Sequence, residues 1–394
     1  MSQRTENLEQ FAIDVILERR RGFRAALLRG LLYALSFIYE RLVQLRLFLY
    51  RHRIFREHTL GCLVISIGNL TVGGTGKTPI VEKFARSLRA GGRRVAILSR
   101  GYKSIPAPTP RKGLFGKKEP QPPRVVSDGK SLLLDSRTAG DEPYMLANNL
   151  KDVVVLVDKD RVKSGLYAIK ELKADTLLLD DGLQYLHLKH RLDIVLIDRQ
   201  APFGNEYLLP RGTLREPPRN LRRASYIFIT KSTGEPNDEL IKRIRRYNRT
   251  AEIIECAHKP LHLQNVLTGE QLPLERLRDT YLGSICGIAA PESFEDGLQK
   301  LGARLELSKR YTDHHRYTEA ELQSFITRCV RRDLEMIVTT EKDAVRFPRL
   351  TKTDVPIYFL RVEIEILSGH ESWEHCVARI CKPQPLLSPA RFFA

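Results

Sequence analysis

The first apolar pattern in the chain is that of a single long helix. In residues 21–56, apolar side chains recur at spacings of three and four and so form one stripe: Leu28, Leu31, Leu35, Ile38, Leu42, Leu45 and Leu49. Arginines flank this stripe, and the longest run without a charge is 30–39. That run is far shorter than the roughly 20 apolar residues that cross a bilayer. The pattern therefore predicts an amphipathic, basic helix that does not span a membrane.

Two locations for this helix remain open from the sequence. A basic helix with one broad apolar face can lie in the headgroup region of an anionic membrane. It can equally pack on its own domain and leave its arginines in solvent. The density of arginine and the tyrosine and phenylalanine content favour the membrane. Nucleic acid is a weaker third partner, because no aromatic-and-basic recognition motif and no zinc finger is present.

Downstream of residue 56 the apolar segments become short and continuous, which is typical of buried parallel strands. Helical stretches alternate with these strands and predict an α/β fold. We expect two α/β/α domains, of which the first is a parallel sheet of the P-loop NTPase type. The expected boundaries are 1–56 for the basic helical segment, 57–220 for the P-loop domain and 221–394 for a second domain that closes the active-site cleft. A basic, proline-rich stretch at 104–124 reads as an insertion.

Composition adds an anionic partner to this picture. The 394 residues carry a formal charge of +18, which favours nucleic acid, anionic lipid or a phosphorylated substrate. The six cysteines form no CxxC pair, and the first residues are polar and acidic rather than those of a signal peptide. We therefore expect a reducing, cytoplasmic compartment and neither a disulfide framework nor a zinc site.

The stretch "ISIGNLTVGGTGKTP" carries the clearest chemistry. It joins a buried strand to a helix start and matches the phosphate-binding consensus G-x-x-x-x-G-K-[ST], with threonine at the first position: Thr71, Val72, Gly73, Gly74, Thr75, Gly76, Lys77 and Thr78. The glycines let backbone N–H groups turn toward an anion, Lys77 can reach the β- and γ-phosphates, and the Thr78 hydroxyl can bind Mg²⁺. Neither "ITKST" nor "TTEKD" is a clean guanine-reading motif, so we expect ATP rather than GTP.

Acidic residues in three motifs are candidates for metal binding and catalysis. "LLDDGL" places Asp180 and Asp181 at the carboxyl end of a strand, where Mg²⁺-dependent phosphoryl transfer needs carboxylates. "GDEP" places Asp141 and Glu142 before a helix, where Asp141 could equally cap the helix. "LREP" contains Glu216, a candidate for the outer shell of the metal, although a surface ion pair explains it as well.

Two histidines follow an aspartate in "RYTDHHRYT". The spaced aspartates of a DHH phosphoesterase are hard to place in this chain, so a metal site of that type is not favoured. A neutral histidine that hydrogen-bonds a carboxylate and tunes it as a general base suits a kinase better. His314 and His315 are both candidates for this role, and a purely structural role stays open.

The order of these motifs resembles the tetraacyldisaccharide 4′-kinase (lipid A 4′-kinase) family. The resemblance runs over nearly the whole chain, through "GNLTVGGTGKTP", "SRGY", "GDEP", "LLDDGLQ", "FGNEYLLPRGTLREP", "GIAAPESF", "DHHRYT" and "TTEKDAVR". It implies transfer of the γ-phosphate of ATP to the 4′-hydroxyl of a tetraacyl glucosamine disaccharide 1-phosphate. The implied location is the cytoplasmic face of the bacterial inner membrane, with the glycolipid and the membrane surface as partners. Neither nucleic acid nor an obligate protein partner is expected.

The resemblance also implies roles for single residues. Asp141 matches the family's proposed base, assisted by a histidine of the DHH motif, for which we choose His314 and hold His315 in reserve. Glu142, Asp180, Asp181 and Glu216 match acidic positions around Mg²⁺ and the nucleophile, and Lys77 and Thr78 match the phosphate and Mg²⁺ positions. After "SRGY" the family pattern has glycine where this chain has Lys103.

Two functions of other classes remain as alternatives to the kinase. A membrane-attached regulatory NTPase or metallochaperone would hydrolyse nucleotide without a lipid acceptor. A nucleic-acid-dependent ATPase would be stimulated by DNA or RNA in a salt-sensitive way.

Overall fold

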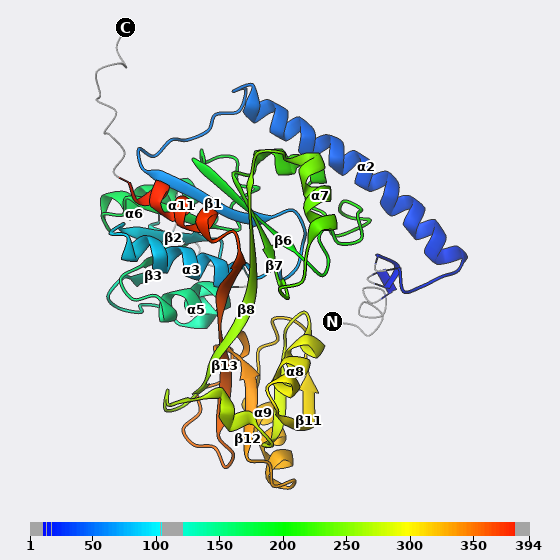
Figure 1. Cartoon of the computed structure of the whole chain (residues 1–394), viewed down its shortest axis with the longest axis vertical. Coiled ribbons are helices and arrows are strands. Elements are labelled where there is room, and N and C mark those ends of the chain that lie inside the picture. Colours follow the sequence, from blue (N-terminus) through cyan, green and yellow to red (C-terminus); the bar gives the residue numbers. More distant parts are fainter. Residues whose placement is uncertain (1–10, 13, 17, 103, 105–120, 383–394) are drawn as a thin grey trace, which may run out of the picture.

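Two lobes share one twisted sheet in this protein. A computed structural model describes residues 11–12, 14–16, 18–102, 104 and 121–382. The long antiparallel strands β8 (Glu252–Asn265) and β13 (Ile357–Ser368) run from the upper lobe into the lower one (Figure 1). We call the part with β1–β7 and α11 the N-terminal lobe and the part with β9–β12 and α8–α10 the C-terminal lobe.

The sheet of the N-terminal lobe has the strand order β7-β6-β1-β5-β2-β4-β3. All pairs are parallel except β3 with β4. These strands are β1 (Leu63–Asn69), β2 (Val95–Ser99), β3 (Arg124–Asp128), β4 (Val154–Val157), β5 (Thr176–Asp180), β6 (Leu192–Asp198) and β7 (Tyr226–Thr230). Every residue of β1 is buried, as its continuous apolar run predicts. The expected parallel sheet is thereby confirmed.

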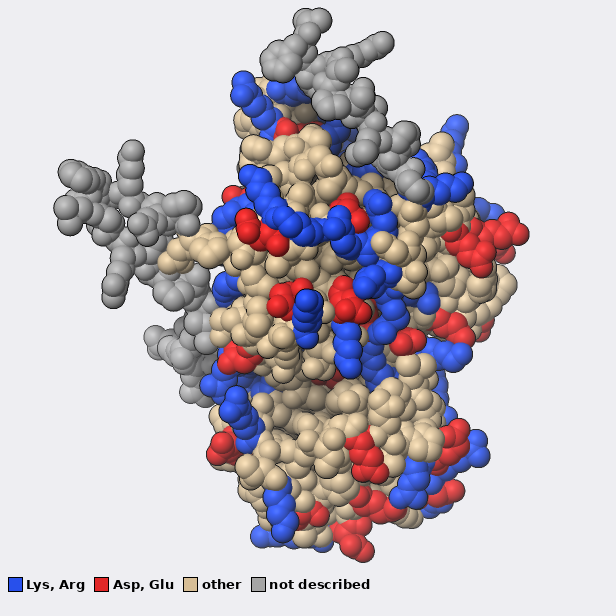
Figure 2. Space-filling model, turned by 90° about the vertical axis from the view of Figure 1, so that its left-hand side faces the viewer, with Lys and Arg blue, Asp and Glu red and all other residues tan. Residues whose placement is uncertain are grey.

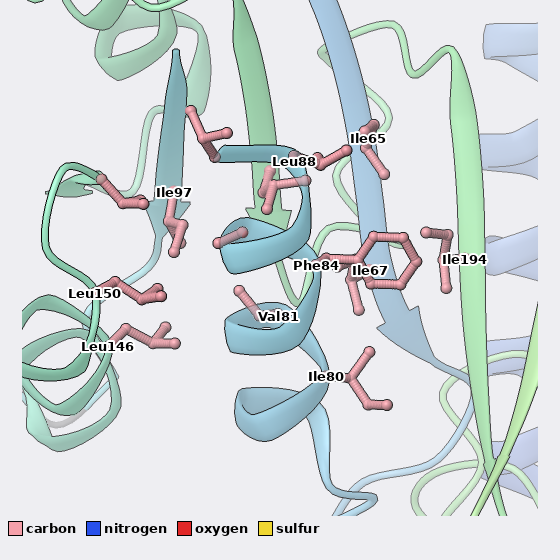
Figure 3. Packing of buried hydrophobic residues seen from close by; sticks show 14 of the residues in the cluster. Ile65, Ile67, Ile80, Val81, Phe84, Leu88, Ile97, Leu146, Leu150 and Ile194 are labelled. Atoms are coloured by element: carbon pink, nitrogen blue, oxygen red, sulfur yellow. The ribbon is translucent and has the colours of Figure 1, made fainter. Parts of the chain in front are cut away.

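Helix α3 (Lys77–Ala90) packs a continuous apolar face on this sheet. Ile80, Val81, Phe84 and Leu88 are fully buried against strands that include β1 and β2 (Figure 3). The Phe84 ring also meets Trp373 of α11 edge-on, with ring centroids 4.6 Å apart. Truncating a phenylalanine in such a core costs about 3–5 kcal/mol. The other helices of this lobe are α4 (Ser136–Ala139), α5 (Asp141–Asn149), α6 (Arg161–Lys170), η1 (Pro218–Arg223), α7 (Asp238–Tyr247) and α11 (His370–Cys381).

The C-terminal lobe continues the same sheet in the order β11-β10-β12-β13-β8. Its own strands are β9 (Gln271–Leu272), β10 (Tyr281–Cys286), β11 (Arg304–Arg310) and β12 (Met336–Thr340), and its helices are η2 (Leu274–Leu277), α8 (Pro291–Lys300), α9 (Glu319–Val330) and α10 (Glu341–Ala344). Parallel pairing of β10, β11 and β12 agrees with the second α/β unit expected from the sequence.

The sheet has no break at residue 221, where the sequence predicts the start of a second domain. Strand β7 pairs with β6, and α11 packs against α3, so both lie in the N-terminal lobe although they follow the predicted boundary. The division of the chain at 220/221 stays a prediction. The insertion expected at 104–124 lies largely outside the described residues, as does Lys103, and Arg124 is the first residue of β3.

Helix α2 (Phe23–Arg51) lies along one side of the N-terminal lobe (Figure 1). One face contacts the loop between β6 and β7, where the Ser36 hydroxyl donates to Leu208 O at 2.8 Å and the Tyr39 hydroxyl donates to Arg215 O at 3.0 Å. Most of the predicted apolar stripe is exposed: Leu31, Leu35, Ile38, Leu42 and Leu45 are each more than two-fifths accessible. None of the helices in the described part of the chain has the length and apolar character to cross a membrane.

Candidate active site

The predicted phosphate loop joins the end of β1 to the start of α3. Lys77 begins α3, and its Nζ lies 3.3 Å from Asn69 Oδ1 and 3.6 Å from Asp181 Oδ1. The loop is fixed from outside, since Val72 N donates to Thr213 O at 2.7 Å and the Thr230 hydroxyl donates to Thr75 O at 2.9 Å. Apart from each glycine and its chain neighbours, no atom of the described residues lies within 4 Å of where a Cβ would stand on Gly73 or Gly74. The loop thus has the strand-to-helix setting and the open glycines that a phosphate site requires.

Asp180 and Asp181 lie beside this loop in contrasting environments. Asp180 ends β5 and accepts from the Ser99 hydroxyl at 3.1 Å, and burial raises its pKa to about 7, with Glu142 and Asp181 adding to the rise. Burial also acts against ionisation of Asp181. There, however, Lys77 and Arg215 outweigh it and lower the pKa of Asp181. Asp181 has a left-handed backbone, with φ of 55°, which is uncommon for a residue other than glycine.

The oxygens around Asp180 fit a hard cation. Asp180 Oδ1 is buried without a hydrogen-bond partner among the described residues, and burial together with the charges of Glu142 and Asp181 raises the pKa of the carboxyl despite Lys77. Carboxylate and hydroxyl oxygens are the ligands that Mg²⁺ prefers. No group of three or more His, Cys, Asp or Glu side chains in the described ranges has an arrangement that could hold a metal ion. A magnesium ion at Asp180 would therefore draw further ligands from elsewhere, such as a nucleotide phosphate.

Glu216 is engaged by protein groups. Arg223 donates to both of its carboxylate oxygens, at 2.8 and 2.7 Å, and Asn220 and Gln184 donate as well. Gln184 in turn lies 3.4 Å from Arg215, which pairs with Asp181 at 2.7 Å. Glu216 thus reaches Asp181 only through these two side chains. Its role near the metal stays a prediction.

Asp141 and His314 come together from the two lobes. Asp141 is the first residue of α5, and His314 Nδ1 lies 3.2 Å from its Oδ2 although 173 residues separate them in sequence. Gly140 lets the start of α5 approach the "SRGY" loop, since a Cβ there would lie 3.2 Å from Tyr102 O. His314 adopts a left-handed backbone with φ of 65°, and its ring meets Tyr102 edge-on. The sequence-based pairing of these two residues agrees with this geometry.

Two arginines of the C-terminal lobe also hold Asp141. Arg346 Nε donates to Oδ2 and Arg316 donates to Oδ1, both at 2.8 Å, while Arg346 additionally donates to Asp343 and to Gly287 O. Burial opposes ionisation of Asp141, but His314 and the two arginines outweigh it and lower the pKa of Asp141. Neither arginine was among the residues predicted from the sequence. Their positions inside "DHHRYT" and "TTEKDAVR" were the available signal.

Glu142 lies at the contact between the two lobes, whereas His315 packs within the C-terminal lobe. Glu142 lies 3.3 Å from Lys342 Nζ of α10. His315 faces away from Asp141: its Nε2 lies 3.2 Å from Glu321 Oε2, and its ring stacks on Tyr311 at 4.2 Å. Glu321 also completes the capping box of α9 with Thr318. His315 therefore belongs to the packing of the C-terminal lobe, and of the two histidines only His314 contacts Asp141.

The phosphate loop, the pair Asp180–Asp181 and the "SRGY" loop follow the carboxyl ends of β1, β5 and β2, the edge at which open α/β sheets bind ligands. Basic side chains are spread over both lobes and lie among acidic ones on the face that Figure 2 shows. A phosphate loop on one lobe and a carboxylate–histidine pair completed by the other define a P-loop protein of the phosphotransferase class.

Comparisons with known proteins identify the family. A model of the family described as Tetraacyldisaccharide-1-P 4′-kinase matches residues 28–382. The chain is 38% identical over 362 residues to the tetraacyldisaccharide 4′-kinase of Syntrophus aciditrophicus, covering 89% of this chain and 93% of that protein. It is 32% identical over 378 residues to that of Halothermothrix orenii, covering 92% and 95%. The chain belongs to the tetraacyldisaccharide 4′-kinase family, the kinases of lipid A biosynthesis.

A solved structure agrees in fold over nearly the whole chain. The LpxK protein of Aquifex aeolicus, crystallised in complex with ATP, superposes with a TM-score of 0.68 and 28% sequence identity, covering 90% of this chain and 99% of that one. The resemblance stated from the motifs is thereby confirmed, and so is the kinase function. Family membership decides against the regulatory NTPase and the nucleic-acid-dependent ATPase.

Proposed function

We propose that this kinase transfers the γ-phosphoryl group of ATP in line to the 4′-hydroxyl of its glycolipid, across the contact between its two lobes. The observation that carries the proposal is the pairing of Asp141 with His314, next in sequence to Glu142, whose charge acts on Asp180. The loop from Thr71 to Thr78 holds the triphosphate, with Lys77 on the β- and γ-phosphates. The acceptor hydroxyl lies at the Asp141–His314 pair, on the opposite side of the phosphoryl group from ADP.

The Asp141–His314 pair accepts the hydroxyl proton in this scheme. Arg316 and Arg346 hold Asp141 in one orientation and keep it ionised. A carboxylate with a lowered pKa is a weak base. A weak base is adequate here, because phosphoryl transfer passes through a loose transition state in which the nucleophile is little bonded to phosphorus. Orientation of the hydroxyl then matters more than the strength of the base.

Magnesium fits the oxygens at the phosphate loop. Thr78, Asp180 and Asp181 would hold the ion, with Glu216 supporting Asp181 through Gln184 and Arg215. When bound, Mg²⁺ supplies charge neutralisation of the phosphate oxygens. Asp180, with a pKa near 7 and an unpartnered oxygen, would become ionised and paired on binding the cation.

The membrane is the second partner in this proposal. The exposed apolar stripe of α2, with the arginines that flank it, suits the headgroup region of an anionic membrane. The opposite face of α2 touches Arg215 and Leu208, on the loop that leads to the phosphate site. Such a helix would dock the enzyme on the cytoplasmic face of the inner membrane, where its glycolipid acceptor resides.

The test follows label from [γ-³²P]ATP into the lipid phase with tetraacyldisaccharide 1-phosphate in mixed micelles. We expect lipid-dependent labelling, little ATP hydrolysis without lipid, and near-complete loss in Lys77→Ala. Asp141→Ala should lower kcat by at least about 100-fold, the size typical of a lost general base, with a small change in the KM for ATP. Turnover by Lys77→Ala, or an unchanged kcat in Asp141→Ala, would contradict the proposal.

A further inference from the structure

Lys342 occupies the contact between the lobes without a role in the mechanism above. It belongs to α10 of the C-terminal lobe, and its side chain is about a quarter exposed. Its Nζ lies 3.4 Å from His314 Nε2, 3.3 Å from Glu142 Oε1 and 3.6 Å from Asp313 Oδ1. One ammonium group is thus shared among three acceptors that come from two lobes.

These contacts are loose compared with those of the neighbouring cations. Charge-assisted N–H···O bonds are usually about 2.7–2.9 Å long. Arg346 and Arg316 meet Asp141 at 2.8 Å, and Arg215 meets Asp181 at 2.7 Å. Those arginines are committed to protein carboxylates. Lys342 is held near its partners but at longer range, so its ammonium can move to a stronger anion at small cost.

The position of Lys342 lies between the two halves of the reaction. On one side it touches Glu142, whose charge acts on Asp180 beside the phosphate loop. On the other side it touches His314, the partner of Asp141. A phosphoryl group that passes from nucleotide to acceptor must cross this interval.

We propose that Lys342 is a further catalytic residue, whose ammonium leaves Glu142 and Asp313 to contact the equatorial oxygens of the phosphoryl group in transit. The inference rests on the proposed function. In the step, the bond between the acceptor oxygen and phosphorus forms and the bond from phosphorus to the β,γ-bridging oxygen breaks. ADP keeps that bond's electron pair, and the hydroxyl proton goes to the Asp141–His314 pair. Lys342 stays protonated and forms no covalent bond.

The role is electrostatic. In phosphoryl transfer the charge of the migrating group spreads over its three equatorial oxygens, and cations aimed at them lower the barrier. Lys77 supplies such a charge from the N-terminal lobe, and Lys342 supplies one from the C-terminal lobe. In the free enzyme Glu142 and Asp313 keep the ammonium in place, so little reorganisation is needed when ATP arrives.

The test compares Lys342→Met, Lys342→Gln and Lys342→Arg in the full-length enzyme, with Lys300→Met on the exposed end of α8 as the matched control. We expect kcat to fall about 100-fold or more in the Met and Gln variants, as for loss of one preorganised donor. The KM for ATP, and the affinity for a non-hydrolysable ATP analogue by calorimetry, should stay within about threefold of the wild-type values. Lys342→Arg should recover part of kcat, and the control should match the wild type.

Three results would overturn the inference while leaving the proposed function intact, provided Lys77→Ala is inactive. The first is a kcat within about threefold of wild type in Lys342→Met. The second is near-normal turnover in Lys342→Gln, which keeps a donor for His314 Nε2 but carries no charge. The third is a loss of ATP affinity as large as the loss of kcat, which would indicate uniform binding. An active Lys77→Ala would instead remove the proposed function itself. Thermal unfolding of each Lys342 variant identifies a variant that fails to fold. If one variant fails, the other two Lys342 variants decide whether the inference holds.

Discussion

Replacing Asp180 by asparagine should stabilise the nucleotide-free protein while abolishing its activity. Asp180 is buried at the end of β5, with one oxygen unpartnered, and its pKa is raised from 3.8 to about 7. The causes are burial first, then the charges of Glu142 and Asp181, which Lys77 and Ser99 only partly offset. In the absence of a cation, the ionised carboxylate is therefore a cost to the folded state.

The size and the pH dependence follow from this pKa. Between pH 3.8 and about 7 the folded state binds the proton of Asp180 more tightly than the unfolded state, so this group lowers stability as pH rises through that window. The cost is complete above pH 7. The difference between about 7 and 3.8, at about 1.4 kcal/mol per pH unit, sets an upper bound of roughly 4 kcal/mol. Solvent entry and relaxation reduce it, and we expect a gain of about 1–3 kcal/mol for Asp180→Asn at pH 8.

Urea unfolding followed by tryptophan fluorescence at pH 5 and pH 8, without Mg²⁺ or nucleotide, measures this gain. The advantage of Asp180→Asn over the wild type should be larger at pH 8, and Asp296→Asn, at an exposed position on α8, should show none. ATP with Mg²⁺ should stabilise the wild type and have little effect on Asp180→Asn. A variant that is less stable than the wild type at pH 8, or whose advantage is independent of pH, would refute the reasoning.

Three further predictions concern the histidine pair, the phosphate loop and a charged cluster that links α3 to β13. In steady-state assays, His314→Ala should lower kcat by at least about 100-fold, because His314 contacts Asp141. His315→Ala should keep kcat within about fivefold, because His315 contacts Glu321 instead. Equal losses of kcat in the two variants would contradict the assignment. Gly76→Ala should weaken the binding of an ATP analogue about tenfold, as measured by calorimetry. The reason is that Gly76 has φ of 79° and that a Cβ there would lie 3.0 Å from His258. An unchanged affinity would contradict the prediction, because the loop would then accept a side chain at this position. Arg361→Met should lower the free energy of unfolding by about 3 kcal/mol, since the largely buried Glu341 loses its arginine partner while Glu82 keeps Arg86. A loss no larger than that of the exposed Arg304→Met would contradict this.

The chemistry of the N-terminal lobe was readable from sequence because it depends on local patterns. A buried strand, a glycine loop and a helix follow one another within residues 63–90, and each has its own signal in propensity and spacing. Strands β2, β4, β5, β6 and β7 are likewise continuous or nearly continuous apolar runs, a pattern that is visible in the sequence. Strands β3 and β11 lack such a run, since β3 is an antiparallel edge strand and β11 is polar and largely exposed.

The parts of the site that depend on distant contacts could not be read in this way. Nothing in local spacing states that Arg346 reaches Asp141 over 205 residues, or that Lys342 reaches His314. Nor could sequence choose between His314 and His315, because the two are adjacent and the choice depends on which ring faces α5. The continuity of the sheet through both lobes could not be predicted for a similar reason. It depends on the pairing of β8 with β13, two strands far apart in the sequence that each extend through both lobes.

The return of the chain from the C-terminal lobe to the N-terminal lobe, as helix α11, bears on how the protein is made. Trp373, Cys376 and Ile380 of α11 complete the core around Phe84, so this core is unfinished until the ribosome has synthesised the whole C-terminal lobe and then α11. Until then the apolar side chains around Phe84 that α11 covers are exposed to solvent, where they can aggregate or bind chaperones. A nascent or prematurely terminated chain would thus carry an intact phosphate-loop sequence on an incompletely packed scaffold.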